Sequence, residues 1–200
     1  MYNCYPVIDE ITIISMEIFE RLREMARITR HDQMEARAQF YGEGNTLSSA
    51  TDINGAETNR HASVDEILSY YRNLYGDNDN KTILDVHTHL RYNELNSEEV
   101  YADDDFRRFT SGDITTHVQR SKALRDNGAR YLSAVIGCDA NRGSATLSIV
   151  GLDNNNAVYH PSTINVTDNN GVVIGALKLD HNGLAILEDF GQKTRLTTVA

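Results

Sequence analysis

The chain has 200 residues, 40% of them hydrophobic and 24% charged, so it can bury a core and is expected to form a single domain over residues 1–200. Its 29 acidic and 19 basic residues give a formal net charge of −10, which repels phosphate backbones and argues against a nucleic-acid partner. No apolar run approaches the roughly 20 residues that span a bilayer, the N-terminus lacks a secretory-signal pattern, and two cysteines are too few for a disulfide framework. We therefore expect a soluble, cytoplasmic protein with no membrane partner.

The residues up to 59 predict a strand, a helix, a second strand and a loop. Residues 11–14 are a β-branched run, which favours a strand, and Ser15 then offers an N-cap for a helix. Four apolar residues at helical spacing predict that this helix lies on a sheet: Ile18, Leu22, Met25 and Ile28. Residues 35–41 alternate between polar and apolar side chains, which predicts a strand with one face in water. Residues 42–59, rich in Gly, Asn, Ser and Thr, predict a loop or a loose hairpin.

The middle of the chain predicts two helices on either side of a buried strand. Ser63 and Glu66 form a capping box at the start of a helix, and Gly76 ends it. Residues 82–86 are an apolar strand. The next helix is expected to begin at residues 110–113 and to stop at Asn127-Gly128.

From residue 131 onward the pattern predicts mainly strands, with the last two joined as a hairpin by the turn Asn182-Gly183. The predicted strands are 131–136, 145–152, 157–160, 172–180 and 184–187. This order of elements predicts a mixed α/β (α+β) fold: a central mixed β-sheet flanked by helices, with extra C-terminal antiparallel strands. The core would span about residues 8–160, and residues 161–200 would form the C-terminal β extension.

His87 and His89, separated by one residue at the end of the predicted buried strand, are candidate metal ligands. Because side chains alternate along a strand, both imidazoles lie on one face and can reach one ion. Asp113, in the first turn of the following helix, offers a carboxylate, and this ligand set suits Zn²⁺ with one position left for water. The alternative is a pair of unrelated surface histidines and an aspartate that favours the positive end of its helix.

Glu35 is the candidate general base, because the strand that carries it could lie beside the histidine-bearing strand with Glu35 on its polar face. The alternative is an exposed glutamate on an edge strand. His117, four residues after Asp113, lies on the same helix face and could support the ligands, although a solvent-facing histidine is the simpler expectation.

Three short motifs occur in the order Glu35-x6-Gly42, His87-Thr88-His89 and Thr110-Ser111-Gly112-Asp113. In this order they resemble the JAMM motif of the JAB/MPN metallopeptidase family, and the resemblance runs from about residue 11 to about residue 152. It implies a JAB/MPN-like (cytidine deaminase-like) fold and Zn²⁺ bound by the two histidines and Asp113. It also implies hydrolysis of an amide or isopeptide bond, with Glu35 moving protons and Thr110 stabilising the oxyanion. The implied substrate is a protein or peptide, with ubiquitin-like conjugates among the candidates.

The chain departs from the family pattern in three places. Leu90 stands where the family has proline, and Thr110 stands where it has serine. Residues 90–109 form a connection longer than the family's, rich in acidic and aromatic side chains. We expect this segment to be either a lid that selects a basic substrate strand or a solvated surface loop.

Two other functions stay open. The string Asp85-Val86-His87-Thr88-His89 also looks like the signature of amidohydrolase and PHP-type metal enzymes, but those barrels typically need ~250 residues, with the signature on the first strand. The third alternative is a catalytically inactive MPN-type protein-interaction module, which the retention of every charged position of the motif disfavours. The oligomeric state is not predicted.

Overall fold

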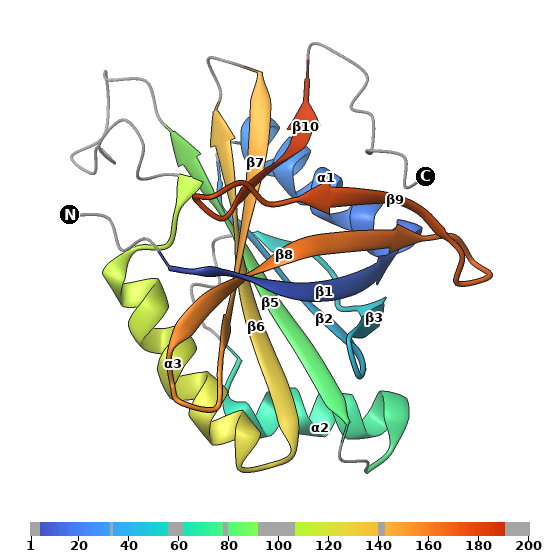
Figure 1. The fold of residues 1–200 in the computed structure, drawn as a ribbon. Helices are drawn as coiled ribbons and strands as arrows, with labels where there is room; N and C mark the ends of the chain where they lie inside the picture. The colour runs from blue at the N-terminus through green and yellow to red at the C-terminus, as the bar shows by residue number, and fades with distance from the viewer. Residues whose placement is uncertain are drawn as a thin grey trace.

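The computed structural model describes residues 5–32, 34–55, 62–77, 80–91, 107–139 and 143–190. The helices and strands in chain order (Figure 1) are β1 (Val7–Ser15), α1 (Met16–Asp32), β2 (Ala36–Glu43), β3 (Thr46–Ala50), β4 (Asn54–Gly55), α2 (Val64–Tyr75), β5 (Lys81–Arg91), α3 (Ser111–Arg125), β6 (Ala129–Asp139), β7 (Ser144–Leu152), β8 (Val158–Thr167), β9 (Val173–Lys178) and β10 (Leu184–Asp189). None of the helices in these residues is long and apolar enough to cross a membrane.

Seven strands close into a barrel in the order β7-β6-β5-β2-β3-β1-β8, and β8 returns to pair with β7. Strands β1 and β8 cross the front of this barrel, ahead of β5 and β6 (Figure 1). The pairs β1–β3, β1–β8 and β5–β6 are parallel, and the other neighbours in the ring are antiparallel. Strands β9 and β10 extend the sheet beyond the closure, on β8 and β7 respectively.

The predicted fold class, a central mixed β-sheet flanked by helices, is therefore wrong. The molecule is mostly strand, with a closed barrel, two further strands at its margins and three helices in the described residues. The pairings that close the ring join segments far apart in the chain, such as β1 with β8. Alternation along a strand records which face is buried but not which strand lies beside it, so closure could not be read from the sequence pattern.

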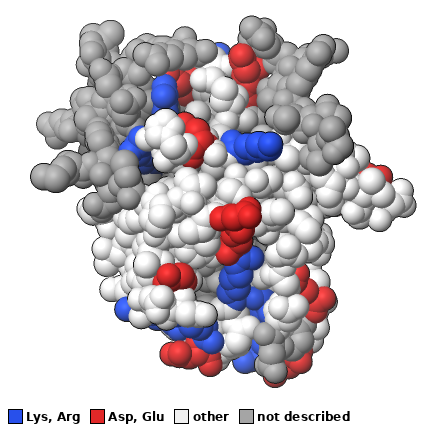
Figure 2. All heavy atoms as spheres, in the orientation of Figure 1, with Lys and Arg blue, Asp and Glu red and all other residues white. Residues whose placement is uncertain are grey.

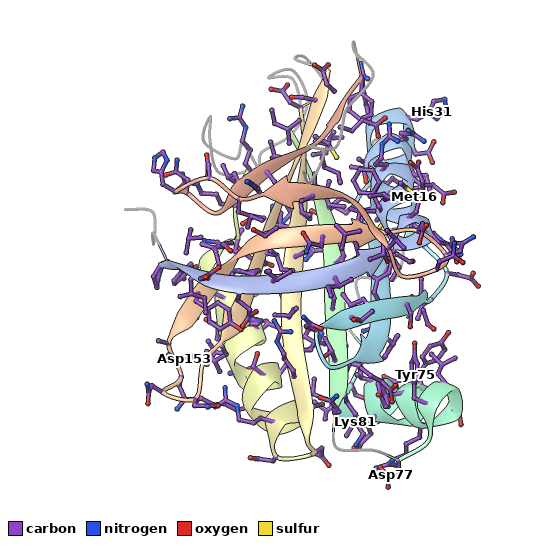
Figure 3. All side chains as sticks on the ribbon, turned by 45° about the vertical axis from the view of Figure 1, so that its right-hand side comes forward. Met16, His31, Tyr75, Asp77, Lys81 and Asp153 are labelled. Atoms are coloured by element: carbon purple, nitrogen blue, oxygen red, sulfur yellow. The ribbon has the colours of Figure 1, made fainter. Side chains whose placement is uncertain are left out.

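The two faces of the barrel wall are covered by different helices. Helix α1 packs its predicted stripe, including Leu22 and Met25, against the apolar residues that the strands turn to the inside. Helices α2 and α3 cover the opposite face of β2, β5 and β6, where Tyr41, Ile83 and Tyr131 are buried. Tyr41 therefore corrects the expectation that one face of the 35–41 strand is in water. Figure 3 shows α1 running from Met16 to His31, with α2 and Tyr75 at the lower end of the molecule.

The predicted loop over residues 42–59 contains two strands, because β3 forms a hairpin with β2 and β4 pairs with the start of β2. The predicted hairpin at Asn182-Gly183 is right in its turn but wrong in its pairing. Strand β9 pairs with β8, whereas β10 crosses to β7. Strand β8 runs across the boundary expected near residue 160. Most of the expected lid, residues 92–106, lies outside the described residues.

Candidate metal centre

Strand β5 presents His87 and His89 on the barrel face that carries α2 and α3. The strand starts at Lys81, at the lower end of the barrel (Figure 3), and so carries both histidines toward the opposite end. Thr88, between them, points to the other face, where its hydroxyl oxygen accepts a hydrogen bond from the Ala36 amide (2.7 Å) and bonds to the hydroxyl of Thr29 (2.6 Å). Thr88 thus fixes β5 to α1 and to the start of β2.

Helix α3 brings Asp113 to the histidines through its N-terminal cap. Thr110 is the N-cap residue and Asp113 the third helical residue of a capping box. The Thr110 amide and hydroxyl both donate to Asp113 Oδ2, at 2.7 and 2.8 Å, and the Asp113 amide donates to Thr110 Oγ1 at 3.2 Å. The cap therefore holds one carboxylate oxygen and sets the direction of the other.

Potential ligand atoms from three side chains converge at this place. The Nε2 atoms of His87 and His89 are 3.1 Å apart. Asp113 Oδ1 lies 3.3 Å from His87 Nε2, and Asp113 Oδ2 lies 3.7 Å from His89 Nε2. Zn–N and Zn–O bonds of roughly 2.0–2.2 Å in a tetrahedron place neighbouring ligand atoms about 3.4 Å apart. The three residues could therefore hold one metal ion, and zinc stays the prediction for its identity.

The cluster is sheltered from solvent, since the His87, His89 and Asp113 side chains are only 10%, 3% and 18% exposed. Burial by itself would raise the pKa of Asp113, but the hydrogen bond and charge of His87 and the two hydrogen bonds from Thr110 outweigh it. The pKa of Asp113 therefore lies well below its ordinary value. The carboxylate stays ionised at neutral pH, as a metal ligand must.

Glu35 lies immediately before β2 and is half-buried. It does not belong to the group formed by His87, His89 and Asp113. Strand β2 pairs antiparallel with β5, with Arg37 opposite His87. Continuing this register by two residues places Glu35 opposite His89 on the same face of the sheet. Gly42, the glycine of the Glu35-x6-Gly42 motif, cannot be replaced by a larger residue without a clash. A Cβ at this position would collide with the backbone of Thr46 at the β2–β3 bulge.

The hydroxyl of Thr110, predicted to stabilise an oxyanion, is engaged with Asp113 as both donor and acceptor. What the geometry shows for Thr110 is a role in orienting the carboxylate of Asp113. The oxyanion role stays a prediction.

Sequence reasoning missed a polar network on the same barrel face, two residues before His87. Asp85 Oδ2 accepts hydrogen bonds from Arg120 Nη1 (2.8 Å) and from the Tyr131 hydroxyl (2.9 Å), and it is not among the grouped ligands. Asp85, the first residue of the string that looks like the amidohydrolase signature, is thus engaged with Arg120 and Tyr131. Residues 85, 87 and 89 are spaced by two along one strand, and this spacing indicates that their side chains share a face.

His117 is fully buried, so the expectation of a solvent-facing histidine is wrong. Its Nδ1 is hydrogen-bonded to Ser133 Oγ at 2.9 Å, and its ring stacks on Tyr131. Burial lowers the pKa of His117 to about 4, against the opposing effects of a backbone hydrogen bond at Gly151 and the charge of Asp85. His117 is therefore neutral at pH 7.

Two hollows of about 570 and 520 Å³ lie away from the cluster and share Glu10 and Arg130 in their walls. Glu10 forms an ion pair with Arg130 and accepts a hydrogen bond from the Tyr159 hydroxyl. Figure 2 shows an acidic group directly above a basic one on the face that β1 crosses. No residue of the metal cluster lines either hollow, so they add nothing to the candidate centre.

The arrangement could bind one divalent ion, and Glu35 lies just before β2, the strand that pairs with the histidine-bearing strand. Two of the three motif segments, His-x-His and Thr-x-x-Asp, meet at the cluster, and the third lies on the neighbouring strand. In comparisons with known proteins, no protein-family model matches this chain and no curated protein is significantly similar to it.

Proposed function

We propose that this chain is a zinc-dependent hydrolase of amide or isopeptide bonds in a protein or peptide, with Zn²⁺ bound by His87, His89 and Asp113. The observation that carries the proposal is the convergence of these three side chains from β5 and α3, at separations that suit a tetrahedral zinc ion. The order of the three JAMM-like motifs supports it.

Bound Zn²⁺ would supply Lewis-acid activation of water and of a substrate carbonyl. The Glu35 carboxylate would take a proton from the attacking water and return it to the departing amine. Support comes from the β2–β5 register, which would bring Glu35 opposite His89 if it continued two residues beyond the Arg37–His87 pair. Thr110 holds Asp113 Oδ2 through two hydrogen bonds, which keeps the carboxylate in one orientation during turnover. A substrate with a lysine-linked amide, as in ubiquitin-like conjugates, suits this chemistry as well as a simple peptide does.

The test compares metal content and hydrolysis in three purified proteins. Wild type is expected to contain about one Zn²⁺ per chain, the number set by a single three-ligand site. His87→Ala should lose the metal. Glu35→Gln should keep it and lose at least about 10²-fold of turnover on isopeptide and peptide substrates, since general-base catalysis contributes about that much.

The control is His31→Ala, which removes an exposed histidine on α1 outside the cluster and should keep both metal and activity. A wild-type protein that binds zinc without hydrolysing any substrate would favour the inactive interaction module. A fully active Glu35→Gln protein would contradict the role of Glu35, and a metal-free wild type would contradict the whole proposal.

A further inference from the structure

Helix α3 has an unusually polar buried face. Its fully buried residues are His117, Ser121 and Leu124, while Ile114 and Val118 are only half-buried. Helices on globular proteins are normally held by an apolar stripe, as α1 is here. Something other than apolar burial must therefore hold much of α3 in place.

Polar side chains fill that role along one face of the helix. Residues 113, 117 and 120 are spaced by four and three positions, so they project from the same side. Asp113 meets His87 and His89, and His117 meets Ser133. Arg120, two helical turns after Asp113, contacts β5 and β6.

The contacts of Arg120 tie α3 to β5, to β6 and to the segment just before α2. Its Nη1 donates to Asp85 Oδ2 (2.8 Å) on β5 and to the Tyr131 hydroxyl (3.3 Å) on β6, and its Nη2 donates to the Ala62 carbonyl (2.7 Å) just before α2. Tyr131 completes the triangle by donating to Asp85 Oδ2 at 2.9 Å. The Arg120 and Asp85 side chains are only 12% and 14% exposed, so the ion pair is poorly screened by solvent.

This ion pair and the metal cluster join the same two elements. Asp85 lies two residues before His87 on one face of β5, and Arg120 lies seven residues after Asp113, about 10 Å along the helix axis. Helix α3 runs opposite to β5 (Figure 1), so the Asp85–Arg120 pair fixes the position and the direction of the helix behind Asp113.

We infer that Asp85, Arg120 and Tyr131 form a clamp that positions Asp113 for metal binding by holding α3 against β5. This inference rests on the proposed zinc site. The three residues are positioning residues, because none of them belongs to the group of ligand side chains that converge on the metal position. Supporting residues of this kind typically change metal affinity by about 10–100-fold when they are removed.

The experiment measures Zn²⁺ affinity by competition with a chromogenic chelator. Arg120→Met, which keeps the length of the side chain but removes its charge and donors, should bind Zn²⁺ about 10–100-fold more weakly than wild type. Arg120→Lys retains a charge facing Asp85 and should recover part of this loss. Tyr131→Phe removes only one hydroxyl and provides a milder variant if Arg120→Met does not fold.

The matched control is Tyr75→Phe, which loses hydrogen bonds to Ser48, Ser49 and the Tyr41 carbonyl without touching the clamp. Its thermal stability should fall while its zinc affinity stays at the wild-type value. Wild-type zinc affinity in both Arg120→Met and Tyr131→Phe would overturn the inference. Equal weakening in Tyr75→Phe would also overturn it, because general destabilisation would then explain the effect.

Hydrogen exchange of the α3 amides without metal separates this inference from the proposed function. Exchange in α3 should be faster in Arg120→Met than in Tyr75→Phe. If wild type binds no Zn²⁺ yet α3 shows this difference, the proposed function fails and the clamp on α3 stands. Unchanged exchange in α3 would contradict the clamp whether or not the protein binds zinc.

Discussion

At the scale of single residues, the odd-numbered and even-numbered side chains of β5 have different roles. The odd-numbered residues 85, 87 and 89 face α2 and α3 and carry the charged group and the two candidate metal ligands. The even-numbered Leu84, Val86 and Thr88 are buried on the opposite face, toward α1. One strand can therefore supply both a polar site and an apolar core, because successive side chains point to opposite faces.

His117 gives a prediction on pH dependence. Its pKa is about 4 in the folded protein, against an ordinary value of 6.5 for an exposed histidine, so the unfolded chain binds more protons between these values. The stability that comes from keeping His117 neutral is complete above pH 6.5 and is lost as the pH falls toward 4. Between pH 7 and 4.5 this loss amounts to about 2–3 kcal/mol.

His117→Gln keeps a polar side chain near Ser133 but cannot titrate. The difference in the free energy of unfolding between pH 7 and pH 4.5, measured by urea denaturation, should be smaller in His117→Gln than in wild type by about that amount. His181→Gln, which changes an exposed histidine in a turn, serves as the control and should behave as wild type. The same pH dependence in all three proteins would show that His117 does not set it.

The grouping of His87, His89 and Asp113 could be predicted from sequence because its signals are local: an alternating pair on a strand and an acid in a helix cap. Arg120 and Tyr131 could not, because nothing in their spacing shows that a half-buried aspartate 35 and 46 residues away faces them. Partner choice between distant polar residues depends on strand order, which local patterns do not record.

At the scale of elements, helices α2 and α3 both begin with a capping box. Helix α2 has the capping box Ser63–Glu66 and α3 has the capping box Thr110–Asp113. The second places its acid against two histidines. Substitutions in the two capping boxes can therefore be compared to separate an effect on helix capping from an effect on metal binding.

Thr110→Ala should lower the free energy of unfolding by about 1 kcal/mol, as should Ser63→Ala, because each removes an N-cap hydroxyl. Only Thr110→Ala should also weaken Zn²⁺ binding, by roughly 10-fold or more, since Asp113 then loses the Thr110 hydroxyl that orients it. Thr110→Ser should keep the affinity. Chelator competition and urea denaturation measure the two effects, and equal zinc affinities in Thr110→Ala and Ser63→Ala would refute the orienting role.

Helices and most strands could be predicted because caps, stripes and alternation are local features. Ser63, Glu66 and Gly76 define α2 as expected. Strand β3 was missed because Thr46–Ala50 is short and polar, and its burial depends on β1 lying parallel to it. The wrong pairing of β9 with β10 has the same origin, since a turn signal gives the reversal of the chain but not the neighbour of each strand.

At the scale of the whole molecule, the closure of the barrel makes the C-terminal strands part of the core. Strand β8 pairs with β1 from Val7 to Ser15 and with β7 near Tyr159, and it buries Ile164 and Val166. The predicted sheet would have left residues after 160 as an addition to a finished core. In the closed ring, their removal leaves β1 without a partner on one side.

A chain that ends at residue 160 should therefore lack a cooperative thermal transition, because the apolar interior and one edge of β1 become exposed. Circular dichroism during heating measures this. The control is full-length Ile174→Ser, which changes an exposed residue of β9 and should unfold within a few degrees of wild type. Cooperative unfolding of the shortened chain would show that residues 1–160 form a complete core.

The most direct test of the metal centre is X-ray diffraction at the zinc absorption edge from crystals grown with Zn²⁺. We expect one anomalous peak about 2.0–2.2 Å from His87 Nε2, His89 Nε2 and an Asp113 carboxylate oxygen. Absence of a peak at this place, or a peak that none of these three side chains touches, would contradict the account.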